Sequence, residues 1–198
     1  MNTLNLLKNT GKFGKFYFKY RGFTPYPIVL LFVFFAEPTP HTFLWGLLLI
    51  GSGELLRIWS VAYIGKETRS REVIAETLVT AGPYAYLRNP LYFGNMLIYT
   101  GATIIANIWM PYFLLLVWIY FTIQYWAIIR LEEDVLAETF AGDYARYKSQ
   151  VPSFLPGVFS TPPPPPAVPD YKTALLSEKS TFLSTFAVLA ILAIRMFA

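Results

Sequence analysis

Residues 80–94 place an arginine among three tyrosines in a polar segment between two apolar ones. Gly82-Pro83 is a turn signal, and Asn89 precedes a proline that disfavours a helical conformation at the residue before it. The polar side chains of this segment are Tyr84, Tyr86, Arg88, Asn89 and Tyr92. An arginine can hold a carboxylate through two parallel N–H groups, and each phenol can form a hydrogen bond. We therefore predict a binding loop at the mouth of the next apolar helix, in preference to a simple connector.

A second set of charged residues, Arg130, Glu132 and Glu133, begins an acidic amphipathic stretch over residues 130–148. This stretch follows an apolar segment directly, so we expect it to lie beside Arg88. Neighbouring side chains on a helix point about 100° apart, so the two glutamates cannot both face one ligand. We expect one to face a ligand and the other to hold Arg88, Arg130 or a backbone donor. The spacing to Leu136 favours Glu133 for the inward role.

The composition predicts an all-α integral membrane protein. Of 198 residues, 55% are hydrophobic and 14% are charged, against about 25% charged in typical globular chains. The chain has no cysteine and a single histidine, His41, which excludes thiolate and multi-histidine metal sites. No glycine-rich motif on a strand–turn–helix pattern is present, which argues against a Rossmann-type cofactor site.

The apolar segments predict about five crossings and four regions. A basic aromatic arm, residues 1–22, is expected to lie on anionic membrane lipids; nucleic acid is the weaker alternative. A membrane domain follows over residues 23–156, with spans near 23–36, 42–64, 91–109 and 111–129. Residues 157–179 form a spacer with five consecutive prolines, and 180–198 form a C-terminal transmembrane helix. The short link at 110–111 makes the third and fourth spans an antiparallel hairpin.

Charge in and near the apolar segments predicts both packing and topology. Glu54 and Arg57 share one helical face, as a self-neutralising pair or as functional groups. Gly51 and Gly53 suggest a helix-packing notch. Lysine and arginine are absent from the turns at 37–41 and 110–111 and gather in the arm, the 65–90 loop and the 130–179 region. The positive-inside rule places those three regions on the cytoplasmic side.

Both polar segments resemble motifs of one family. Residues 82–94, GPYAYLRNPLYFG, are similar to the GPYxYxRHPxYxG signature of the isoprenylcysteine carboxyl methyltransferase and phospholipid methyltransferase superfamily of membrane enzymes. A second group of residues resembles the family's second signature, REExxLxxxFGxxYxxYxxxVPxxxP. Its members are Arg130, Glu132, Glu133, Leu136, Phe140, Tyr144, Tyr147, Val151-Pro152 and Pro156. The two motifs share the family's order and spacing, and the resemblance covers residues 50–156.

The resemblance implies transfer of a methyl group from S-adenosylmethionine to a lipid-like or prenylated carboxylate that enters from the bilayer. It assigns Tyr84, Tyr86, Arg88, Asn89, Tyr92, Glu132 and Glu133 to the cofactor, and Arg88, Asn89, Tyr92 and Arg130 to the reacting centre. No metal is expected. The family histidine is Asn89 here, which cannot titrate, and the glycine after Phe140 is Ala141. The alternatives are a phospholipid amine N-methyltransferase, a membrane reductase of related architecture, and a non-catalytic membrane scaffold.

Overall fold

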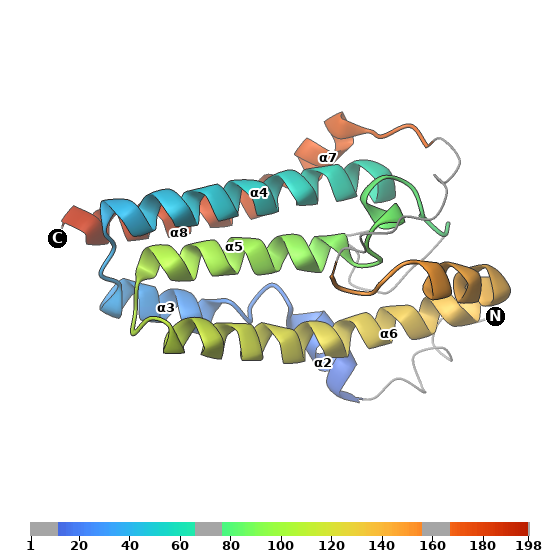
Figure 1. Cartoon of the computed structure of the whole chain (residues 1–198), viewed down its shortest axis with the longest axis horizontal. Coiled ribbons are helices and arrows are strands. Elements are labelled where there is room, and N and C mark those ends of the chain that lie inside the picture. The colour runs from blue at the N-terminus through green and yellow to red at the C-terminus, as the bar shows by residue number, and fades with distance from the viewer. Residues whose placement is uncertain (1–11, 66–76, 156–166, 198) are drawn as a thin grey trace.

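The computed structural model describes residues 12–65, 77–155 and 167–197, and all regular elements in these ranges are helical. Figure 1 shows long helices lying side by side along one axis. The elements are α2 (Lys12–Tyr20), α3 (Tyr26–Phe35), α4 (Pro40–Ile64), the 3₁₀ helix η2 (Gly82–Ala85), α5 (Pro90–Ala106), α6 (Tyr112–Gln150), α7 (Tyr171–Ser177) and α8 (Lys179–Phe197). The prediction of an all-α membrane protein is confirmed.

Three of these helices, α4, α6 and α8, are long and apolar enough to cross a membrane. The 10 residues of α3 and the 17 residues of α5 fall short of the roughly 20 that a straight crossing needs. The predicted count of five crossings therefore stays a prediction.

Helices α4 and α5 pack closely because glycines face each other at two levels. A Cβ added at Gly53 would lie 2.6 Å from the carbonyl oxygen of Gly94, and one added at Gly46 would lie 2.4 Å from that of Gly101. Small residues let two helix backbones approach in this way. Gly53 thus confirms the predicted notch, whereas a Cβ at Gly51 would meet open space.

The turn after α5 is hydrogen-bonded to the turn between α3 and α4. Asn107 takes the left-handed conformation that ends the helix (φ 53°), and its side-chain amide donates to the carbonyl oxygen of Glu37 at 3.1 Å. The backbone N–H of Glu37 in turn donates to Ala106 at 2.9 Å. The predicted hairpin of α5 and α6 is present, and its turn lies beside the turn between α3 and α4.

Helix α6 continues well past its apolar part and then reverses at a kink. Ala141 has φ 41° and ψ −111°, a conformation that favours glycine, at the position where the family motif has one. After the kink the chain folds back (Figure 1), and the hydroxyl of Tyr147 donates to the carbonyl oxygen of Tyr84 at 2.7 Å. The kink therefore brings the end of the second motif onto the 3₁₀ helix of the first.

The C-terminal segment packs on the bundle. The backbone N–H of Asp170 donates to the carbonyl oxygen of Ala62 at 2.8 Å, which places α7 at the end of α4. Leu192 of α8 is fully buried in the core of the bundle. At the far end of α8, Arg195 Nε donates to the carbonyl oxygen of Ala36 at 3.2 Å.

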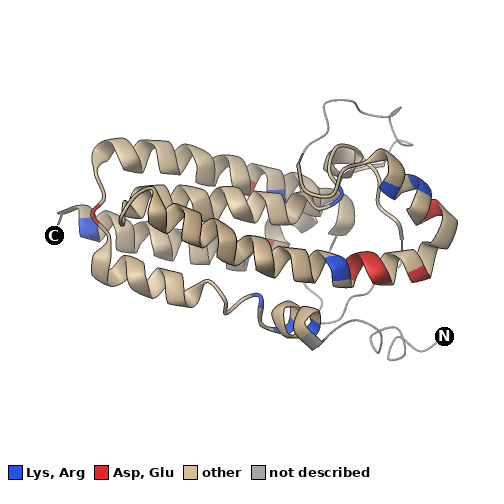
Figure 2. Cartoon of the chain, turned by 60° about the horizontal axis from the view of Figure 1, so that its bottom comes forward, with Lys and Arg blue, Asp and Glu red and all other residues tan. Residues whose placement is uncertain are grey.

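Charged residues gather at one end of the bundle (Figure 2). This end holds α2, the loop that carries Arg88, and the acidic part of α6, while the opposite end holds the turns at 36–39 and 107–111. The spatial grouping matches the grouping predicted from charge. Lys66, and the structure of the proline-rich stretch up to Pro166, lie outside the described residues.

Candidate active site

A cavity of about 930 Å³ lies between the charged end and the middle of the bundle. Helices α2 to α6, α8 and the loop before α5 all contribute to its walls. Six of the predicted site residues line it: Tyr84, Arg88, Asn89, Tyr92, Glu132 and Glu133. The two motifs therefore meet at one cavity, as their resemblance to the family implies.

Arg88 joins the two motifs through its guanidinium group. It donates to Glu133 Oε1 from Nε at 3.1 Å and from Nη2 at 2.7 Å, and to the carbonyl oxygens of Lys148 and Val151 from Nη1. Its backbone N–H donates to Pro152 at 2.9 Å. Four of the five guanidinium N–H groups thus have protein acceptors. Arg88 fixes the shape of the cavity wall, and little of its donor capacity remains for a ligand.

Glu133 holds the salt bridges at this end. Its second oxygen, Oε2, lies 2.9 Å from Lys148 Nζ, while Oε1 lies 2.7 Å from Arg88 Nη2. One glutamate was expected to hold Arg88, and that role falls to Glu133. The spacing had favoured Glu133 for the inward role, but its contacts are those of a positioning residue.

Glu132 is the carboxylate that the geometry leaves for a ligand. It lines the cavity, and its Oε1 accepts a hydrogen bond from the hydroxyl of Tyr92 at 2.7 Å. Tyr92 packs its ring against Tyr125, with centroids 4.8 Å apart, so the phenol that orients Glu132 is itself held by α6.

Asn89, which replaces the family histidine, ties the loop to the end of the second motif. Its side-chain amide donates to the backbone oxygen of Ser153 at 3.0 Å and to the hydroxyl oxygen at 3.2 Å. The Asn89 side chain therefore positions backbone at the cavity, a role that does not require titration.

Tyr84 presents a buried hydroxyl at the cavity. The side chain is 5% exposed, and its hydroxyl has no hydrogen-bond partner among the described residues. Burial raises the pKa of this phenol well above its ordinary value, so at neutral pH it remains a hydrogen-bond donor. A buried donor with no partner is costly in a folded protein, which makes Tyr84 a candidate ligand contact.

Two predicted site residues lie away from the cavity. The side chain of Tyr86 is 47% exposed. Arg130 is exposed, with its guanidinium carbon 4.7 Å from the ring centroid of Trp126. Neither is among the residues that line the cavity, so the assignment of Tyr86 to the cofactor and of Arg130 to the reacting centre lacks geometric support.

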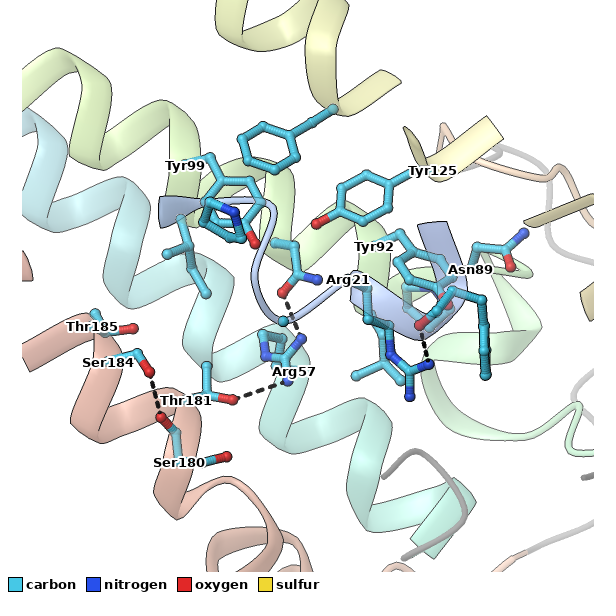
Figure 3. A pocket seen from close by; sticks show the side chains of 18 of the residues that line it. Arg21, Arg57, Asn89, Tyr92, Tyr99, Tyr125, Ser180, Thr181, Ser184 and Thr185 are labelled. Atoms are coloured by element: carbon cyan, nitrogen blue, oxygen red, sulfur yellow. Dashed lines mark hydrogen bonds between the residues drawn. The ribbon is translucent and has the colours of Figure 1, made fainter. Parts of the chain in front are cut away.

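The cavity also contains a polar cluster that the assignment of site residues missed (Figure 3). Arg57 lies at its centre and donates to Glu178 Oε2 from Nη2 at 2.6 Å, to Asn95 Oδ1, and to the hydroxyl of Thr181 at 3.3 Å. The sequence had marked Glu54 and Arg57 either as a self-neutralising pair or as functional groups. The ion pair shown for Arg57 is with Glu178, which is 0% exposed, while Glu54 accepts a hydrogen bond from Thr185 at 2.6 Å.

Aromatic side chains make up much of the wall between the polar cluster and the bundle core. Tyr99 stacks on Phe121 with centroids 3.9 Å apart, and Phe121 stacks on Tyr125 at 5.9 Å. Asn95 and Tyr99 are polar side chains in the otherwise largely apolar α5, and both line the cavity. Arg21, which follows α2, also lines the cavity.

The donor set fits S-adenosylmethionine in kind. Glu132 offers a carboxylate for an ammonium group, and Tyr84 offers a phenolic donor for a carboxylate. Among the described residues no cluster of three or more histidine, cysteine, aspartate or glutamate side chains could hold a metal ion.

Comparison with known proteins gives one curated relative and one family. The chain is 32% identical over 112 residues to the cobalt-zinc-cadmium resistance protein CzcN of Cupriavidus metallidurans, an alignment that covers 56% of the chain and 47% of the relative. The chain thus spans about half the length of this relative. No solved structure matches the chain. Residues 41–143, which include the Arg88 loop and both glutamates, match the phospholipid methyltransferase family model. This match covers more than half of the chain, which therefore belongs to the phospholipid methyltransferase family.

Proposed function

We propose that this protein is a multi-pass membrane methyltransferase that uses S-adenosylmethionine and acts on a lipid-like carboxylate acceptor from the cytoplasmic side. The observation that carries the proposal is a single cavity in which Glu132, Tyr84 and Asn89 meet walls of apolar helices. Its volume of about 930 Å³ is near the upper end of the range for ligand sites, about 300–1,000 Å³. That size leaves room for a cofactor together with part of an acceptor.

The polar end of the cavity binds the cofactor and orients it. Glu132, held by Tyr92, pairs with the cofactor's ammonium group, and the Tyr84 hydroxyl donates to its carboxylate. Arg88 and Glu133 keep the loop and α6 at a fixed separation. When bound, S-adenosylmethionine supplies a methyl group on a positively charged sulfur. The protein's contribution is to hold the acceptor oxygen in line with that methyl, at about 3–3.5 Å.

A carboxylate acceptor suits this set of residues because it is already ionised at neutral pH. No histidine is among the described residues that line the cavity, and His41 lies at the opposite end of α4. An ammonium acceptor has to lose a proton before it can attack. The absence of an imidazole at this cavity therefore favours the carboxylate over the phospholipid amine.

Calorimetric titration of the detergent-purified full chain tests the proposal. We expect saturable binding of S-adenosylhomocysteine and none of NADPH. NADPH binding alone would favour a reductase, and binding of neither would favour a scaffold; either result contradicts the proposal. Transfer of labelled methyl to a prenylated cysteine carboxylate, compared with phosphatidylethanolamine, then identifies the acceptor class.

A further inference from the structure

The wall of the cavity formed by α8 lies outside the region that matches the family. The family match ends at residue 143, whereas Thr181, Thr185, Ala187, Val188 and Ile191 of α8 all line the cavity. Figure 3 shows the hydroxyl side chains of this helix on the side of the cavity opposite Tyr99 and Tyr125. Helix α8 thus completes the cavity from outside the matched region.

The position of α8 is fixed at three levels along its length. Immediately before its first residue, the fully buried Glu178 forms an ion pair with Arg57 at 2.6 Å. In its first half, the hydroxyl of Thr185 donates to Glu54 Oε1 at 2.6 Å. At its end, Arg195 donates to the carbonyl oxygen of Ala36. These three contacts hold α8 against the cavity.

The cavity-facing side of α8 changes from polar to apolar along its length. Four hydroxyl side chains, at residues 180, 181, 184 and 185, line its first part together with Leu183, and the lining residues after Thr185, which are Ala187, Val188 and Ile191, are all apolar. From Thr181 to Ile191 the helix rises by about 15 Å. The walls formed by α4 and α5 also change from polar to apolar with distance from the charged end. Helix α4 ends and α5 begins at that end, so Arg57 and Asn95 lie nearer to it than the apolar Ile50 and Ala102 do. The cavity is therefore shaped for an amphiphile whose head lies at the charged end.

The cavity also has exposed residues on both of its outer edges. Phe23 and Tyr26 are 63% and 62% exposed on one edge, and Leu183 is 70% exposed on α8, yet all three line the cavity. An apolar chain can therefore reach the interior between α8 and the start of α3.

We propose that α8 is the element that selects the acceptor: its apolar face bounds the channel for the acceptor's single apolar chain and sets the chain length that fits. This inference rests on the proposed function, because the acceptor is the methyl acceptor of that same site. It assigns a role in substrate selection to the C-terminal helix and to Ala187 in particular, where a larger side chain would fill the apolar part of the channel.

The test compares Ala187→Trp with Phe186→Trp in the full chain. Phe186 is the adjacent residue, is 70% exposed and does not line the cavity. Ala187 is exposed and lines the cavity, so a tryptophan there takes up space in the channel without overpacking the core. We expect Ala187→Trp to lower kcat/KM for farnesyl and geranylgeranyl cysteine carboxylates by about tenfold. The geranyl compound should be affected least, and the dissociation constant of S-adenosylhomocysteine should not change. Phe186→Trp should match the wild type in all of these measurements.

A second measurement does not depend on methyl transfer. A fatty acid that carries a diazirine near its chain end is photo-crosslinked to the protein in lipid nanodiscs, and the labelled residues are mapped by mass spectrometry. Phe32 and Ala102 are only 3% and 7% exposed and line the cavity, so labels there report a chain inside it. We expect these labels in the wild type and in Phe186→Trp, and their loss in Ala187→Trp.

Unchanged chain selectivity in Ala187→Trp, or persistence of labels at Phe32 and Ala102, would overturn the proposal for α8. If the wild type transfers no methyl group, the proposed function fails, but loss of those labels in Ala187→Trp still supports α8 as a wall of the lipid channel. The two failures are therefore distinguishable.

Discussion

At the scale of single residues, the two adjacent glutamates of α6 have different surroundings. Glu132 accepts from Tyr92 at the cavity, whereas Glu133 is held by Arg88 and Lys148. We predict that Glu132→Gln weakens S-adenosylmethionine binding tenfold to hundredfold, because loss of a hydrogen bond to a charged group costs about 1.5–3 kcal/mol. Its melting temperature should remain near that of the wild type. Calorimetry and thermal melting in one detergent measure both quantities.

The matched changes at Glu133 and Glu138 complete this prediction. Glu133→Gln removes the charge partner of Arg88, whose side chain is 9% exposed, so we expect it to lower the melting temperature as well as the affinity. Glu138 is exposed farther along the same helix, and Glu138→Gln should change neither. Equal, near-wild-type affinity in all three variants would contradict the placement of the cofactor beside the acidic part of α6.

The motifs alone could not decide which of their side chains face the cavity. The resemblance named Tyr84 and Tyr86 together, but η2 turns Tyr84 into the protein and leaves Tyr86 exposed. Spacing along a short irregular segment does not reveal which of two alternating side chains points inward. Arg130 fails for a related reason: on α6 it lies on the outer face, where it stacks on Trp126.

At the scale of elements, the apolar segments and their turns were predictable because local signals define them. Proline at the start of α4 and α5, and the two-residue link before α6, fixed those boundaries to within a few residues. The partner of Arg57 was not predictable: Glu178 lies 121 residues away along the chain, beyond the proline-rich stretch, and only tertiary packing brings it to α4. The division of the chain into a membrane domain and a separate C-terminal helix stays a prediction. In the structure α8 packs along the cavity.

Helix α4 offers a test of element packing with a built-in control. A Cβ at Gly53 would lie 2.6 Å from the backbone oxygen of Gly94, whereas one at Gly51 would meet nothing within 4 Å. We predict that Gly53→Ala destabilises the protein by about 1–3 kcal/mol, the usual cost of overpacking, because backbone cannot move aside as a side chain can. Gly51→Ala should be neutral or slightly stabilising, since alanine favours a helix more than glycine does. Melting temperatures that fall equally for both variants would contradict the close packing of α4 on α5.

At the scale of the whole molecule, function depends on which side of the membrane the charged end faces. The arm, the Arg88 loop and the acidic part of α6 share that end (Figure 2), and His41 lies at the opposite end of α4. The positive-inside rule orients lysine and arginine toward the cytoplasm, where S-adenosylmethionine is made and used. The proposed orientation thus brings the cavity's polar end to the cofactor, while its apolar part stays at the depth of the lipid chains.

Single introduced cysteines can test this orientation without background labelling, because the chain contains no cysteine. Arg146 is exposed beyond the kink of α6 and His41 is exposed at the start of α4, and neither lines the cavity. We predict that a membrane-impermeant maleimide labels His41→Cys in intact cells but labels Arg146→Cys only after permeabilisation. Labelling of both variants after permeabilisation is the control for accessibility. Labelling of Arg146→Cys from outside intact cells would place the polar end of the cavity away from the cytoplasm, and the proposed use of S-adenosylmethionine would then lose its source of cofactor.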